Sequence, residues 1–442
     1  MQVTTRLRRL VLTTIVFAIG YAESSNAICE RSNGPQKLVV LFDGTWNGDS
    51  SKTNVGLLAT EIGTIAKEST NIHSLYVPGV GTDFRRFSGG STGWGFARKV
   101  RSGYSYIAEC YEDGDQIYIF GFSRGAFEAR TLAAMIQQVG ILNYQSYSLK
   151  KSGKLKGMRD DVEEAYKIMK SAGKEAYFKR VGKKFPSTPS DRWRGQITKD
   201  EAVNKLDAKG LEGKRRLNRA SITLVGVWDT VGALGLKHRE KESLYLIGLE
   251  DLPDLKYAYQ ALSIDETRPS FWPVPWTEAG FDRPGQTSEE VWFPGGHADV
   301  GGGWADVAKV ENGRLADISL NWMAGKLRKE GLVRPDFARW SEEKQGKLAV
   351  AIRHIKNQPL KDPERRDIKA QSQIHASVCD RMAAGEETIR EKKHWWQSKR
   401  PQTKMPYRPL NVASSGGTLE GTFKVLDWNG DASNSCSRHL DP

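Results

Sequence analysis

A serine between two glycines stands in the stretch IYIFGFSRGAFEAR, residues 117–130. The run before Ser123 is apolar and the run after it has helical spacing, so the serine falls at a strand-to-helix turn. A serine hydroxyl becomes a useful nucleophile only when a neighbouring base takes its proton. The G-x-S-x-G pattern alone is weak, because a chain with 44 glycines has a fair chance of containing it.

A base and an acid follow other apolar runs, at the point where each run ends. Asp229 follows ITLVGVW, and His297 follows EEVWFPGG. Taken singly, Asp229 fits a turn or helix-cap carboxylate, and His297 fits a hydrogen-bonded turn histidine. Ligands of an open parallel sheet bind at the carboxyl ends of the strands. We therefore predict that Ser123, Asp229 and His297 meet there as nucleophile, acid and base.

The turn around the serine has further requirements. Gly121 and Gly125 allow the tight strand-to-helix turn and leave room for neighbouring elements. The backbone N–H of Arg124 is expected to supply one oxyanion donor, and Gly44 or Thr45, after the first strand, a second one.

Other polar residues leave alternatives open. In FDGTW, Asp43 resembles the second aspartate of aspartyl-phosphate phosphatases, but the nucleophilic position two residues earlier is Leu41. We therefore expect Asp43 to brace the active-site loop. Asp299 is expected to bind loop N–H groups or to orient His297 in place of the predicted acid, and His375 is the rival base.

The elements that position these residues alternate between strands and helices. Buried strands are predicted at residues 37–43, 74–79, 116–123, 221–229 and 289–296. Their continuous apolar runs indicate strands covered on both faces. Helical spacing follows over residues 55–65 and 126–136, the second stretch ending near Gly140. We predict an α/β-hydrolase-like, doubly wound and mostly parallel sheet.

The remaining segments are expected to belong to the same catalytic domain, which spans residues 28–442. A basic helical insertion is predicted at about residues 143–219, and a basic helical C-terminal extension at about residues 305–442. Hydrophobic residues make up 38% and aromatics 10%, which is typical of a folded protein.

Residues 1–27 have the three-part layout of a signal peptide: a basic start, the apolar run LVLTTIVFAIGYA and small residues at a cleavage point. The apolar run is shorter than the about 20 residues of a spanning helix. We expect export to the periplasm or beyond, with an uncleaved anchor as the alternative. The four cysteines are Cys29, Cys110, Cys379 and Cys436. Their spacing predicts no metal site; one or two disulfides or free buried thiols are expected.

The net charge of +13 indicates an anionic partner. Export favours phospholipid headgroups over nucleic acid, so we expect contact with an anionic membrane surface and no nucleic acid. No cofactor is expected, and the sequence does not define the oligomeric state.

Six motifs occur in the order LFDGTWN, PGVGTD, GFSRGAFEAR, VWDTVGALG, SIDETR and WFPGGHADVGGGW. Together they resemble the α/β-hydrolase-like catalytic domain of type VI secretion phospholipase effectors, over about residues 37–304. The resemblance implies phospholipid ester hydrolysis, with the catalytic roles on Ser123, Asp229 and His297. Effectors that pass through an injection apparatus need no signal peptide, so an ordinary exported hydrolase stands beside a toxin effector as an alternative that the sequence leaves open.

The leading hypothesis is therefore a serine hydrolase of phospholipids or related lipids that works through an acyl-enzyme. One alternative is a catalytically silent, exported lipid- or envelope-binding protein, with GWGFAR and HWWQ at the membrane interface. Another is an esterase of a soluble ester.

Overall fold

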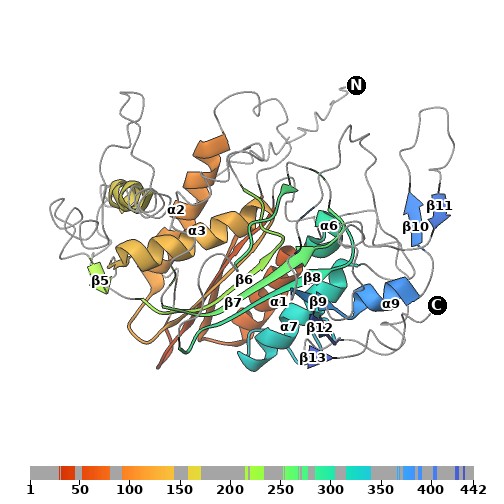
Figure 1. Cartoon of the computed structure of the whole chain (residues 1–442). Coiled ribbons are helices and arrows are strands. Elements are labelled where there is room, and N and C mark those ends of the chain that lie inside the picture. Colours follow the sequence, from red (N-terminus) through yellow and green to blue (C-terminus); the bar gives the residue numbers. More distant parts are fainter. Residues whose placement is uncertain are drawn as a thin grey trace, which may run out of the picture.

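The predicted sheet forms the centre of a computed structural model of the chain (Figure 1). The structure describes residues 29, 31–44, 52–79, 92–143, 158–170, 215–217, 220–232, 252, 254–266, 268, 271–276, 284–303, 315–339, 366, 368, 372–383, 387–390, 402–405, 424–427 and 432–433. Residues 1–27, where a signal peptide is predicted, lie outside the described residues, as do Thr45 and Cys436.

Five strands occupy the predicted positions: β1 (Lys37–Phe42), β2 (Ile72–Val77), β3 (Gln116–Phe122), β6 (Ile222–Trp228) and β8 (Thr287–Phe293). A sixth, β7 (Leu255–Ser263), lies between β6 and β8 and was not predicted. Its sequence LKYAYQALS is interrupted by polar residues. Gln260 is nevertheless buried, because it hydrogen-bonds Thr230 and Glu290 on the neighbouring segments.

The full sheet has nine strands in the order β13-β12-β9-β8-β7-β6-β3-β1-β2. Every neighbouring pair is parallel except β12 and β13. The carboxyl ends of β3, β6 and β8 therefore meet at one edge, as the sequence predicts. This confirms the mostly parallel α/β fold.

The described residues beyond residue 304 include strands as well as helices. They form α7 (Ala316–Lys329) and α9 (Ser377–Ala383), and also the sheet strands β9 (Gln373–His375), β12 (Lys424–Leu426) and β13 (Ala432–Ser433). A separate antiparallel pair joins β10 (Glu387–Arg390) to β11 (Gln402–Met405). Strands of two to four residues are too short to show the alternation that reveals a strand in sequence.

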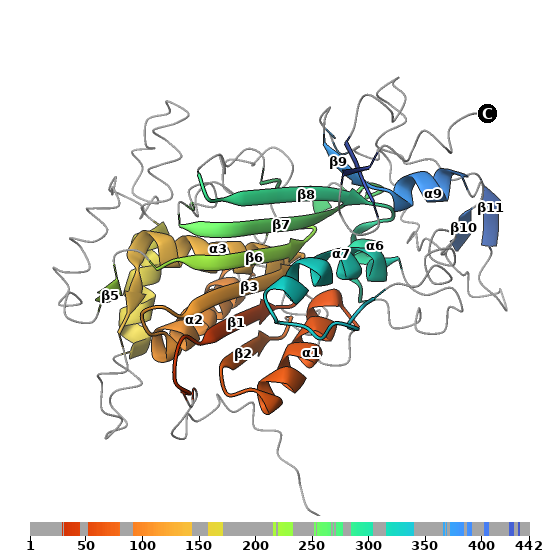
Figure 2. The same ribbon diagram turned by 90° about the horizontal axis from the view of Figure 1, so that it is seen from below.

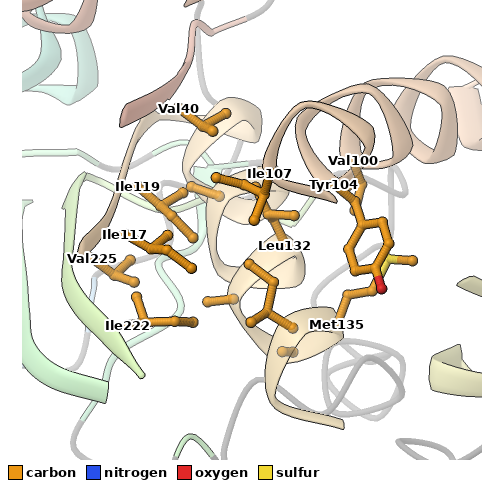
Figure 3. Packing of buried hydrophobic residues seen from close by; sticks show 14 of the residues in the cluster. Val40, Val100, Tyr104, Ile107, Ile117, Ile119, Leu132, Met135, Ile222 and Val225 are labelled. Atoms are coloured by element: carbon orange, nitrogen blue, oxygen red, sulfur yellow. The ribbon is translucent and has the colours of Figure 1, made fainter. Parts of the chain in front are cut away.

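Helices cover both faces of the sheet (Figures 1 and 2). Side chains alternate along β1: Leu38 and Val40 pack with α2 (Thr92–Cys110) and α3 (Arg124–Val139). Val39 and Leu41 instead join the cluster of α1 (Asn54–Glu68) and α7. Figure 3 shows the first cluster, in which strand residues such as Val40 face the helices. Two cores thus hold the central strands in place.

The helix boundaries follow the sequence signals. α3 begins directly after Ser123 and ends before Gly140, whose φ of 74° suits a glycine cap. A helix over residues 158–170 lies inside the segment expected as an insertion, and it buries Val162, Ala165 and Met169 in the first core. The short strands β4 (Ile141–Leu142) and β5 (Arg215–Leu217) pair at the ends of the same segment.

Cys29 and Cys110 form a disulfide, and both lie within the described residues. Cys379 is disulfide-bonded as well. No helix in the described part of the chain has the length and hydrophobicity to cross a bilayer. Over the same residues, no group of three or more histidine, cysteine or acidic side chains is arranged to hold a metal ion.

Candidate active site

Ser123 stands on a sharp turn between β3 and α3, with φ 59° and ψ −124°. This is an unusual conformation for a residue other than glycine, and such conformations are concentrated at functional sites. A Cβ at Gly121 would lie 2.4 Å from the carbonyl oxygen of Gly125, and one at Gly125 would lie 2.3 Å from that of Phe42. Both glycines are therefore required by close backbone approach, as the sequence predicts for a nucleophile elbow.

The structure brings the three predicted side chains together. His297, the first residue of α6 (His297–Gly301), places its Nε2 2.7 Å from the Oγ of Ser123. Its Nδ1 lies 2.5 Å from the Oδ2 of Asp229. All three residues are buried. They form one hydrogen-bonded chain from hydroxyl to imidazole to carboxylate, which is the arrangement for drawing a proton from a serine.

Asp229 follows β6 with a positive φ of 42° and is fully buried. Its Oδ1 accepts the Ser263 N–H at 2.9 Å and an Arg366 N–H at 2.6 Å. A second Arg366 nitrogen donates to Oδ2 at 2.9 Å. Burial alone would raise the pKa of Asp229, but the charge of Arg366 and the hydrogen bonds from His297 and Arg366 hold that pKa well below its ordinary value. The carboxylate is therefore ionised at neutral pH.

The His297 ring is enclosed by aromatic groups. Phe122 stacks on it with ring centroids 4.7 Å apart, and Phe271 meets it edge-on at 4.8 Å. Burial lowers the pKa of His297, although the hydrogen bond that its ring donates to Asp229 opposes this shift. The imidazole is therefore neutral at neutral pH, which is the form that accepts a proton.

A second carboxylate supports the histidine from its backbone side. Glu266 Oε2 accepts the His297 N–H at 3.1 Å, and Arg268 binds both oxygens of Glu266 at 2.8 Å and 2.6 Å. Burial would raise the pKa of Glu266, but the hydrogen bonds and charge of Arg268 lower it to about 2. Both residues belong to the motif SIDETR, so the sequence carried a signal for them although it assigned them no role.

Asp299 binds loop backbone, and Asp43 binds the side chains of two neighbouring elements. Asp299 Oδ2 accepts the Gly296 N–H at 2.9 Å, which is one of the two arrangements left open by the sequence. Asp43 accepts hydrogen bonds from Thr53 and Tyr76, both at 2.7 Å. These contacts hold the end of β1, and burial raises the pKa of Asp43.

The backbone N–H groups expected as oxyanion donors differ in their hydrogen bonding. The Arg124 N–H opens α3, at a position where a helix offers no acceptor of its own. The Gly44 N–H donates to Asp43 Oδ1 at 2.6 Å and is therefore engaged. Thr45, the alternative second donor, lies outside the described residues.

The rival base is placed elsewhere. His375 is buried in β9, where its Nδ1 lies 2.8 Å from the Oγ of Ser377 and its ring stacks on Phe293. The histidine that contacts Ser123 is His297.

The fold and site define an α/β-hydrolase-like protein with a serine, a histidine and an aspartate joined at the carboxyl edge of its sheet. The family described as "T6SS, Phospholipase effector Tle1-like, catalytic domain" matches residues 36–326. This match covers more than half of the chain, and the protein belongs to that family. The resemblance in the six sequence motifs is confirmed.

Individual relatives are distant. The uncharacterized protein YEL023C of Saccharomyces cerevisiae is 32% identical over 112 residues, which are 25% of this chain and 14% of the yeast protein. A crystal structure of an uncharacterized Pseudomonas aeruginosa protein is 17% identical, with a TM-score of 0.37, over 73% of this chain and 49% of that one.

A structure of the Tle1 effector bound to the VgrG spike of the type VI secretion system is 16% identical. Its TM-score is 0.28, over 62% of this chain and 52% of that one. The chain thus spans about half the length of these two solved proteins and much less of the yeast protein. The fold assignment depends on the sheet topology described above.

Proposed function

We propose that this protein is a serine ester hydrolase that cleaves phospholipids or related lipids through an acyl-enzyme. The observation that carries the proposal is the hydrogen-bonded chain from Ser123 through His297 to Asp229. Membership of a phospholipase effector family supports a lipid as the substrate.

In the proposed reaction, Ser123 Oγ attacks the carbonyl carbon of the ester while His297 Nε2 takes its proton. The carbonyl oxygen becomes an oxyanion that the Arg124 N–H stabilises. When the tetrahedral intermediate collapses, the bond to the alcohol breaks and His297 returns the proton to that leaving group. Water then attacks the acyl-serine with the same base, releasing a fatty acid and restoring the serine.

Asp229 fixes the histidine in the productive tautomer. Because its Oδ2 accepts from Nδ1, the lone pair of Nε2 faces the serine hydroxyl. The ionised carboxylate also stabilises the imidazolium formed in the transition state.

Charge and compartment support a membrane lipid as the substrate. The net charge of +13 favours peripheral contact with an anionic membrane surface. We also propose that the chain is exported with residues 1–27 removed. The disulfide between Cys29 and Cys110 supports export, since such bonds persist in oxidising compartments. N-terminal sequencing of the protein recovered from the periplasm or medium tests this, and a protein that retains residue 1 contradicts cleavage.

The test of the enzymatic proposal is fatty-acid release from vesicles of anionic and zwitterionic phospholipid by the purified protein, with a soluble ester in parallel. Ser123→Ala should abolish release. Ser102→Ala, which removes an exposed hydroxyl on α2, is the matched control and should leave activity unchanged. Equal activity in wild type and Ser123→Ala would refute the mechanism.

A fluorophosphonate probe separates the enzyme from a catalytically silent lipid-binding protein. We expect the probe to label Ser123, because the adjacent base activates its hydroxyl. Vesicle binding without labelling or hydrolysis would favour the silent protein.

A further inference from the structure

Arg366 lies beyond residue 326, where the family match ends, and yet it reaches the candidate site. Its side chain is 2% exposed, and the Asp229 side chain that it contacts is fully buried. No motif surrounds it in the sequence, and it was not among the predicted site residues.

Arg366 contacts the carboxylate of Asp229 and two backbone carbonyl groups. Two guanidinium nitrogens bind the two oxygens of Asp229, at 2.6 Å and 2.9 Å. The same nitrogens donate to the carbonyl oxygens of Ser263 and Phe271, at 2.8 Å and 2.6 Å. Such a two-pronged contact fixes the plane of a carboxylate, which a single lysine charge does not.

The two backbone contacts connect the acid to the surroundings of the base. Ser263 is the last residue of β7, and its own N–H binds Asp229 Oδ1. Phe271 packs its ring against the His297 ring. Arg366 thus joins, through one planar group, the carboxylate, the end of a central strand and the segment that covers the histidine.

We propose that Arg366 is a positioning residue of the active site, so that the chain beyond the matched catalytic domain is part of the catalytic apparatus. It holds the Asp229 carboxylate in the plane that His297 Nδ1 requires and balances its negative charge. This inference rests on the proposed function, because it assigns Arg366 a part in the same proton transfer.

The charge balance has a measurable consequence. The charged groups that act on His297 are Asp229, Glu266 and Arg268, and Arg366 acts in turn on the carboxylates of Asp229 and Glu266. Without the Arg366 charge, the negative charge of Asp229 is no longer balanced. Asp229 then stabilises the imidazolium form of His297 more strongly. The base is then protonated at a higher pH, and the acid limb of the kcat/KM profile moves to higher pH. A purely structural role would lower activity without moving this limb.

Two variants separate geometry from charge. Arg366→Met removes both, and we expect kcat to fall about tenfold to a hundredfold with little change in KM, less than the about 10⁴-fold loss for removing a triad acid. Its acid limb should move to higher pH. Arg366→Lys keeps the charge but loses the planar fork, so kcat should fall while the acid limb stays in place.

The matched control is Arg334→Met. Arg334 makes the same kind of two-pronged contact, but with Glu61, which is not a member of the candidate triad. This variant should keep both kcat and the profile of the wild type. If Arg366→Met does not fold, Arg366→Lys carries the test alone, and a wild-type kcat in that variant overturns the proposal.

A readout without turnover separates this inference from the proposed function. Titration of His297 in ¹⁵N-histidine-labelled full-length protein should show a higher pKa in Arg366→Met than in wild type. Such a shift in a protein that hydrolyses no ester would refute the proposed function while supporting the role of Arg366 in the cluster. Hydrolysis by wild type, with kcat, acid limb and titration unchanged in Arg366→Met, would overturn the inference and leave the function standing.

Discussion

Gly125→Ala provides a stringent test of the elbow geometry, because it adds one methyl group without touching a candidate catalytic side chain. The added Cβ would lie 2.3 Å from the Phe42 carbonyl oxygen and 2.7 Å from that of Asp43. Both atoms are backbone atoms at the end of β1 and cannot rotate away as a side chain would. Either α3 or the end of β1 must move.

The required displacement is about 1 Å, the difference between these separations and ordinary van der Waals contact. Overpacking of this kind costs about 1–3 kcal/mol, which equals or exceeds the gain of about 1 kcal/mol when alanine replaces glycine in a helix. Ser123 directly precedes α3 and would move with it. A misplacement of about 1 Å in an active site reduces the rate about a hundredfold.

The measurements are the free energy of unfolding in urea and kcat for ester release. The matched control is Gly63→Ala in α1, where an added Cβ meets nothing within 4 Å. That variant should gain about 0.5–1 kcal/mol of stability and keep its kcat. If Gly125→Ala were as stable and as active as Gly63→Ala, the close approach of α3 to β1 would be refuted.

Three other perturbations follow from the structure. The kcat/KM of the wild type should rise with pH through a midpoint below the ordinary pKa of histidine, because burial lowers the pKa of His297; a midpoint above that value contradicts this. Replacing Cys29 and Cys110 by serine should reduce the free energy of unfolding by about 4–5 kcal/mol, since the disulfide closes a loop of sequence separation 81; a urea titration measures it, and an unchanged midpoint refutes it. Burial raises the pKa of Glu128 from 4.5 to about 7, so its contribution to stability is present below pH 4.5 and lost as pH rises through 7. Glu128→Gln should remove that decline in unfolding free energy between pH 4.5 and pH 8, and a decline of wild-type size in the variant would contradict it.

The central strands and the three clustered residues were predictable because they depend on local signals. β1, β3 and β6 are buried on both faces, so they appear in the sequence as continuous apolar runs. In a parallel sheet, the residue after each run lies at the same edge, which brought Ser123 and Asp229 together in the prediction. The sequence did not predict β7, because polar residues such as Gln260 interrupt its apolar pattern. Gln260 can be buried only through a hydrogen-bond network that forms on folding.

Arg366 could not be predicted for the same reason. An arginine in a polar segment is typical of a solvated surface, and nothing local distinguishes it from its neighbours. Its burial depends on Asp229, which is 137 residues away in the chain. Glu266 and Arg268 lie in a motif that the sequence singled out. The contact of Glu266 with the His297 N–H, however, required the end of β7 to meet the loop before α6.

The electrostatic balance around His297 explains how a buried histidine can serve as a base. Two carboxylates approach it: Asp229 at its ring and Glu266 at its backbone N–H. Without counterions, two buried negative charges would favour the imidazolium and remove the proton acceptor at rest. Arg366 and Arg268 each bind one of the carboxylates with both prongs, so the surroundings are close to neutral and burial keeps the ring uncharged. When the ring takes the serine proton, the hydrogen bond to Asp229 is already formed and needs no rearrangement. The arginines thus keep the base available before reaction, while the acid remains aligned to stabilise the charge that reaction creates.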